Sequence, residues 1–170
     1  MDTHPYKDNS YIEVFRESPE SLERIYTSFR DEVDQLRSNN GKIIIPEFTI
    51  QSPDEHWNFT GVEVIPHNIR QDVLQPGVVT ALDALLSLVE QERLSQLKLT
   101  WYQSIRSANP VDSYWVEKID ISQEAKDRCG FVYETGAKAF SGFRGSHIHI
   151  PSDVRVTISP EYAHWFWICL

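Results

Sequence analysis

Apolar residues recur every three or four positions through the N-terminal part of the chain. This spacing places them on one side of a helix, so it predicts an amphipathic helix of about five turns. Ser18 is a good N-cap, Pro19 suits the first helical position, and Asn40 or Gly41 can take the left-handed conformation that ends a helix. The predicted apolar stripe consists of Leu22, Ile25, Tyr26, Phe29, Val33 and Leu36.

A second helix is predicted where Thr80 is followed three residues later by Asp83. The pair imitates a capping box, with Asp in place of the usual Glu. Leucines and a valine then follow at helical spacing, and we expect this helix to end near Glu92 or Leu94. Its buried stripe would be Leu82, Leu85, Leu86 and Val89.

The remaining segments alternate between apolar and polar residues, or are continuously apolar, as strands do. Residues 42–45 read as a short strand that ends at Pro46, and 61–65 as another. Residues 131–140 resemble a hairpin that turns around Thr135 and Gly136. The C-terminal run is apolar on both faces and predicts an interior strand. Further strands are expected at 97–102, 114–119 and 154–158, with the C-terminal strand at 164–170.

This order of elements predicts an α+β fold, with a mixed or antiparallel sheet packed against one or two helices. We expect the strands after the second helix to share a single sheet. Residues 1–60 would form an N-terminal helical extension packed on the domain, and residues 61–170 would form the α+β core.

Composition narrows the class of protein. With 170 residues and 19.7 kDa, the chain predicts one domain that needs neither disulfide nor metal to fold. Its net charge of −9 opposes binding to nucleic acid. No apolar run approaches the length of a membrane span, and the polar start is not a signal peptide, so we expect a soluble, cytoplasmic protein.

Three segments in order resemble the β-grasp domain similar to the C-terminal part of transcobalamin. They are 79–85 (Val-Thr-Ala-Leu-Asp-Ala-Leu), 114–119 (Tyr-Trp-Val-Glu-Lys-Ile) and 131–138 (Phe-Val-Tyr-Glu-Thr-Gly-Ala-Lys). The resemblance covers about residues 61–170, although Thr135 stands where Asn is usual. It implies a β-grasp-like fold and a module that binds a ligand or a protein, and it assigns no catalytic residue.

The pair His147 and His149 carries the main chemical hypothesis. Side chains two apart in a strand share a face, so the two imidazoles could hold one divalent transition metal if a third ligand folds in. Glu161 is our preferred third ligand. The alternative is that Ile148 and Ile150 face the core and both imidazoles are solvated without a ligand. The other third ligands considered are Asp153, His164 and His67.

A loop and a group of aromatic residues carry the binding hypothesis. Phe143 and Arg144 lie between glycines and could present a ring and a cation to a partner, although the sequence favours an ordinary surface loop. Trp115 and Tyr133 belong to a run of aromatics that could form an exposed platform or fill a sheet core.

The two cysteines, Cys129 and Cys169, lack metal-site spacing, and we expect free buried thiols in a reducing compartment. A disulfide would be expected only if the protein is exported. Taken together, the sequence favours a non-catalytic binding module for a small molecule or a protein partner. One alternative is a small metal-dependent enzyme that uses His147 and His149. Another is a scaffold or inhibitor whose acidic N-terminal helix docks on a partner. The ligand and the oligomeric state stay open.

Overall fold

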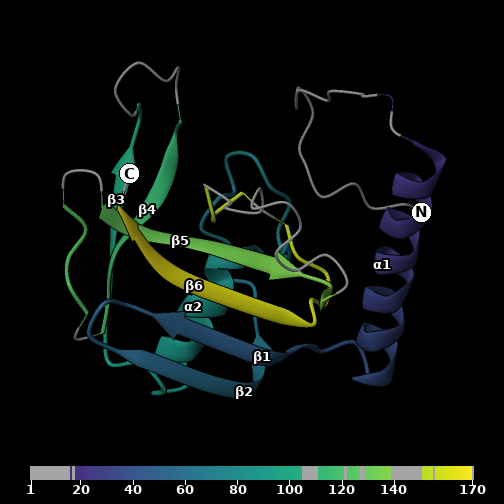
Figure 1. Ribbon diagram of the computed structural model, residues 1–170, viewed down its shortest axis with the longest axis horizontal. Coiled ribbons are helices and arrows are strands. Elements are labelled where there is room, and N and C mark those ends of the chain that lie inside the picture. Colours follow the sequence, from purple (N-terminus) through teal and green to yellow (C-terminus); the bar gives the residue numbers. More distant parts are fainter. Residues whose placement is uncertain are drawn as a thin grey trace.

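The computed structural model describes residues 16, 18–104, 111–120, 122–126, 129–138, 151–154 and 156–169. Within these ranges two helices and six strands form two sheets, which confirms the α+β class. The expected single sheet is wrong, because two strands form a separate ribbon (Figure 1). In chain order the elements are α1 (Pro19–Ser38), β1 (Ile43–Gln51), β2 (His56–Val64), α2 (Ala81–Glu90), β3 (Leu97–Tyr102), β4 (Ser113–Ile119), β5 (Cys129–Gly136) and β6 (Tyr162–Cys169).

The larger sheet has the strand order β2-β1-β6-β5. β1 and β2 form an antiparallel hairpin, β6 returns parallel to β1, and β5 pairs antiparallel with β6. β3 and β4 make the antiparallel ribbon. The C-terminal strand is therefore interior to its sheet, as the sequence predicts. The boundary predicted at residue 60 falls within β2, so β1 and the first part of β2 belong to the sheet.

The core lies between the larger sheet and α2, which crosses behind it (Figure 1). Leu82, Leu85 and Leu88 of α2 are fully buried against Phe48 and Trp165 of the sheet. The predicted capping box starts α2, because Thr80 and Asp83 satisfy each other's backbone donors. The helix ends at Glu90, slightly earlier than predicted.

β1 runs through Pro46, contrary to the prediction that a strand ends there. β6 pairs only with the part of β1 from Glu47 to Gln51. Pro46 therefore lies where β1 has no neighbour on that side, and its missing N–H removes no hydrogen bond to β6. Because β1 continues to Gln51, β2 pairs with it from His56 onward and is longer than the segment 61–65 predicted for it.

Two further predictions are wrong. β5 does not turn at Thr135 and Gly136, because it continues through both residues, which pair with Ala163 and Tyr162 of β6. The expected strand at 154–158 is absent from the described part of that segment, where Val156 makes only an isolated bridge to Thr80. The alternation of valines indicates an extended segment, but it does not indicate whether another strand lies beside that segment to pair with it.

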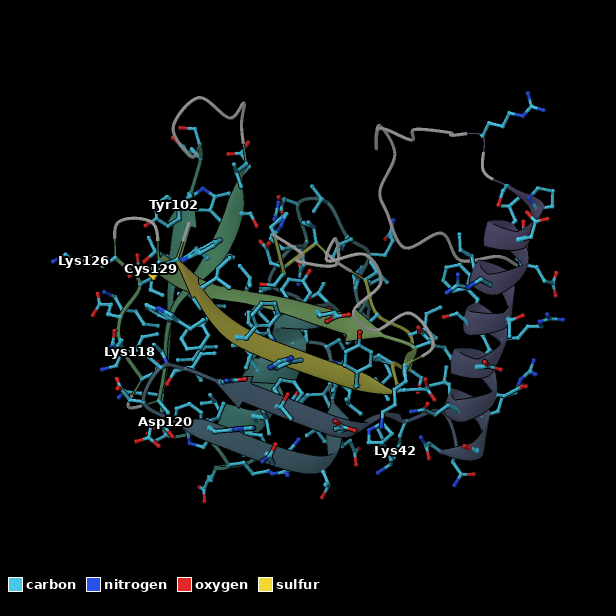
Figure 2. The ribbon with its side chains drawn as sticks, in the orientation of Figure 1. Lys42, Tyr102, Lys118, Asp120, Lys126 and Cys129 are labelled. Atoms are coloured by element: carbon cyan, nitrogen blue, oxygen red, sulfur yellow. A yellow bond between two sulfur atoms is a disulfide. The ribbon has the colours of Figure 1, made fainter. Side chains whose placement is uncertain are left out.

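The two cysteines form a disulfide, so the prediction of free thiols is wrong. Cys129 begins β5 and Cys169 ends β6, and the two residues face each other across the strand pair with their Cα atoms 4.0 Å apart. Figure 2 shows Cys129 near Lys126 and Tyr102 at the end of the sheet away from α1, while Lys42 lies at the α1 end.

Helix α1 stands beside the sheet (Figure 1). It ends as predicted, with Asn40 and Gly41 both at positive φ, of 56° and 81°. Hydrogen bonds from its C-terminal half join it to the rest of the molecule. The Gln35 amide donates to the carbonyl oxygens of Ile44 (3.0 Å) and Pro160 (3.4 Å), and the Ser159 N–H donates to Glu32 (3.2 Å).

Candidate functional site

The predicted metal site is only partly within the described structure. His147, His149, Phe143 and Arg144 lie outside the described residues. The carboxylate of Glu161 accepts a hydrogen bond from the backbone N–H of Lys138 at 2.6 Å. Within the described ranges, no cluster of three or more His, Cys, Asp or Glu residues could hold a metal ion.

The two aromatic residues predicted to bind a ligand are brought together, but Tyr133 is buried and Trp115 is half-buried. Tyr133 is only 1% exposed, stacks on Trp165 and donates its hydroxyl hydrogen to the carbonyl oxygen of Pro151 at 3.0 Å. Trp115 and Tyr133 line the same void, whose volume is about 10 Å³. Such a void has room for about one water molecule and none for an organic ligand.

A buried ion-pair network joins three distant parts of the chain, and no pattern in the sequence indicates it. Arg70 donates to Asp153 at 2.6 Å and makes a two-pronged pair with Asp72, with both N···O distances 2.9 Å. Asp153 also accepts from the Ser113 hydroxyl and from the Tyr114 N–H (3.0 Å). Every charge in the network has a partner, so its evident role is to hold the loops together.

The same network shifts two pKa values. Burial by itself lowers the pKa of Arg70, but the hydrogen bonds to Asp72 and Asp153 outweigh it and raise that pKa above its usual value. The hydrogen bond from Arg70 lowers the pKa of Asp72 below 3.8. Both shifts favour the charged forms that the ion pairs need.

His67 and Asp83 form a carboxylate–imidazole pair. Asp83 accepts from the Nδ1 of His67 at 3.0 Å and from its backbone N–H at 2.8 Å, while its other oxygen accepts from the N–H and hydroxyl of Thr80. The Nε2 of His67 lies 3.3 Å from Glu90. Because one oxygen of the carboxylate caps α2 and the other accepts from His67, the pair is explained by its structural role.

The face of the larger sheet turned away from α2 carries a second polar group. Glu134 and His164 face each other across β5 and β6, and the Tyr162 hydroxyl donates to Glu134 at 2.6 Å. Burial and the bond to Glu134 raise the pKa of Tyr162. Burial lowers the pKa of His164 below 6.5, an effect that the charge of Glu134 opposes and that of His56 reinforces. Glu134 and His164 line neither of the two larger cavities described below.

The most unusual surface is the apolar stripe of α1. Leu22, Ile25, Tyr26 and Phe29 are 40, 36, 60 and 51% exposed, respectively. Among the described residues, the other exposed large apolar side chains are Ile65, Trp101 and Tyr102, and both aromatic rings have partners. Arg70 lies 5.0 Å from the ring centroid of Trp101, and the Tyr102 hydroxyl donates to Glu117. A run of exposed apolar residues on one helix indicates an interaction surface.

A groove of about 660 Å³ follows this stripe along α1. Its floor includes Tyr26, Phe29 and Val33, and its rim carries both signs of charge, from Glu23, Arg30, Asp34 and Arg37. A second cavity of about 250 Å³ lies between α1 and the body of the protein, where Phe29 and Glu32 face residues 135–136 and 156–160. Both of these larger cavities thus involve α1.

We call Leu22, Ile25, Tyr26, Phe29 and Val33 the α1 stripe. The sequence predicts the stripe but not its exposure, because periodicity identifies an apolar face without showing what packs on it.

Comparison of the chain with protein-family models, with characterised proteins and with solved structures finds no match. Neither described helix combines the length and the apolar character needed to cross a membrane.

Proposed function

We propose that this chain is a non-catalytic protein-binding module and that the α1 stripe is its binding surface. The observation that carries the proposal is the exposure of four large apolar side chains on a single helix, whereas the apolar side chains of α2 are all buried or half-buried. Leaving them in water forgoes on the order of 1 kcal/mol or more per side chain, which a partner would recover on binding.

The shape of the groove favours a protein segment over a small molecule. Its lining residues run from Glu23 to Arg37, which is about 21 Å of helix at 1.5 Å per residue. An open, elongated apolar floor with a charged rim suits a second helix laid alongside, as in other helix-in-groove complexes. The rim charges would then select the partner and its orientation. The β-grasp resemblance, which implies a binding module, supports the same function.

The Cys129–Cys169 disulfide bears on where the module works. Disulfides persist mainly in oxidising compartments, so we propose such a compartment in place of the cytoplasmic location expected from the sequence. Alkylating the protein directly in its native cells, without reduction, tests this. Two unmodified cysteines in the mass spectrum are expected, and two alkylated cysteines would refute it.

The binding proposal is tested by placing a photo-crosslinking amino acid at Tyr26 in the groove and, as a matched control, at Thr27 on the neighbouring face of α1. We expect a defined adduct from position 26 and little from position 27. The crosslinked protein, identified and purified, should bind wild-type chain at least tenfold more tightly than the Phe29→Glu variant. Equal adducts from both positions, or equal affinity of the two chains, would contradict the proposal.

A further inference from the structure

We infer that the partner of the α1 stripe is the α1 helix of a second copy of this chain, packed antiparallel to the first. This inference rests on the proposed function and identifies the partner that the α1 stripe binds. It would give the protein a two-fold symmetric dimer joined by a short helix pair.

The first argument is the spacing of the stripe. Leu22, Tyr26, Phe29, Val33 and Leu36 are separated by four, three, four and three positions, and Ile25 lies directly beside them. This is the heptad alternation of a coiled-coil seam, with Tyr26 and Val33 at the a positions and Leu22, Phe29 and Leu36 at d.

The second argument is that an antiparallel pair forms apolar layers throughout its centre. In antiparallel coiled coils an a residue of one helix packs beside a d residue of the other. With the two-fold axis between Thr27 and Ser28, Leu22 packs beside the partner's Val33, and Tyr26 packs beside the partner's Phe29. Symmetry repeats both contacts, so four consecutive layers contain only apolar side chains.

The third argument is charge. In the same register Glu23 of one helix lies beside Arg30 of the other, and symmetry makes this contact twice. Within one chain the two residues already form an exposed ion pair, with an N···O distance of 3.1 Å, so both can change partner without being buried unpaired. A parallel pair would bring together Glu32 and Arg37 instead, but Glu32 already accepts the Ser159 N–H of its own chain. Charge complementarity therefore favours the antiparallel pair.

The attachment of α1 leaves the N-terminal part of this seam free. At 3.6 residues per turn, Glu32 lies about a quarter of a turn and Gln35 somewhat more than a third of a turn from the seam. Phe29 also lines the cavity between α1 and the body, and Val33 and Leu36 are half-buried. The exposed apolar side chains also lie toward the N-terminal half of α1, between Leu22 and Phe29. An antiparallel interface centred between Thr27 and Ser28 covers Tyr26 and Phe29 with one another and Leu22 with the partner's Val33.

The experiment is to measure the mass of the purified, oxidised protein by sedimentation equilibrium from micromolar to millimolar concentration. We expect reversible association from the monomer of 19.7 kDa to a dimer. Phe29→Glu should weaken the dimer at least a hundredfold, whereas Thr27→Glu, which adds the same charge off the seam, should change the dissociation constant less than threefold. Circular dichroism verifies that both variants are folded.

Charge exchange tests the register. Glu23→Arg and Arg30→Glu should each weaken self-association about tenfold, because like charges then meet twice across the interface. A mixture of the two variants should recover the wild-type affinity as a heterodimer, although the ion pair within each chain stays broken. Wild-type chain that remains monomeric throughout, or a mixture no tighter than either variant alone, would overturn the inference.

The photo-crosslinker at Tyr26 separates this inference from the proposed function. An adduct to α1 of another copy supports both. An adduct to a different protein, with a monomeric wild-type chain, overturns the antiparallel dimer and leaves the binding function standing. No adduct from Tyr26 overturns both.

Discussion

The buried ion-pair network makes a sharp prediction at Asp153. Its carboxylate is 0% exposed and accepts hydrogen bonds from Arg70, the Ser113 hydroxyl and the Tyr114 N–H. Asp153→Asn keeps the side-chain shape but removes the negative charge and replaces one acceptor oxygen with an NH₂ group. That group cannot accept from the donors around it, and Arg70 loses its buried counter-charge.

Breaking a buried pair by removing one partner destabilises proteins by about 3–5 kcal/mol. In urea, with an m-value of about 2 kcal/mol/M for a chain of this size, the unfolding midpoint should fall by about 1.5–2.5 M. The melting temperature should fall by about 10 °C or slightly more.

The matched control is Asp72→Asn, which also removes a carboxylate paired with Arg70. The side chain of Asp72 is 55% exposed, so its loss should lower the free energy of unfolding by about 1 kcal/mol or less. The reasoning is refuted if Asp153→Asn unfolds within about 1 kcal/mol of the wild type, or if the two variants are equally destabilised.

Two further predictions concern the disulfide and the outer face of the sheet. The double variant Cys129→Ala, Cys169→Ala should have a free energy of unfolding about 4 kcal/mol lower than the wild type, because the disulfide no longer restricts the unfolded chain over a sequence separation of 40. A loss under about 1 kcal/mol in chemical denaturation would contradict this. His164 should titrate below pH 6.5 in NMR, because burial lowers its pKa. As pH falls below 6.5, the unfolded chain binds a proton that the folded chain does not, so folding stability should fall. Glu134→Gln should lower the pKa of His164 further, and a higher midpoint in that variant would show that the Glu134 charge does not act on it.

The sequence predicted the features that depend on local interactions. Helix α1 and its end at Asn40 and Gly41 follow from nearby residues, as does the capping box of Thr80 and Asp83. Gly136 shows the limit of such reasoning: glycine suits a turn or a strand end equally, and only the pairing with Tyr162 of β6 decides between them.

Long-range pairing accounts for most of what was missed. The parallel β1–β6 pair joins residues more than 100 positions apart, and Arg70 meets Asp153 across 83 positions. The disulfide follows from a different strand pair, β5 and β6, whose register brings Cys129 opposite Cys169. In the candidate site, the pattern identified the α1 stripe, but whether a helix face is covered depends on the rest of the fold.

Pulsed electron-spin distance measurement tests the central claim most directly. Spin labels attached through unnatural amino acids at Glu20 and, separately, at Thr27 leave the disulfide intact and occupy the same position of the heptad. The antiparallel dimer places the two residue-20 labels about 22 Å apart along the helix axis, and the two residue-27 labels nearly level, at about 1.5 Å rise per residue. We therefore predict a short distance at Thr27 and a clearly longer one at Glu20. Equal distances at both positions, or no distance between chains, would contradict the account.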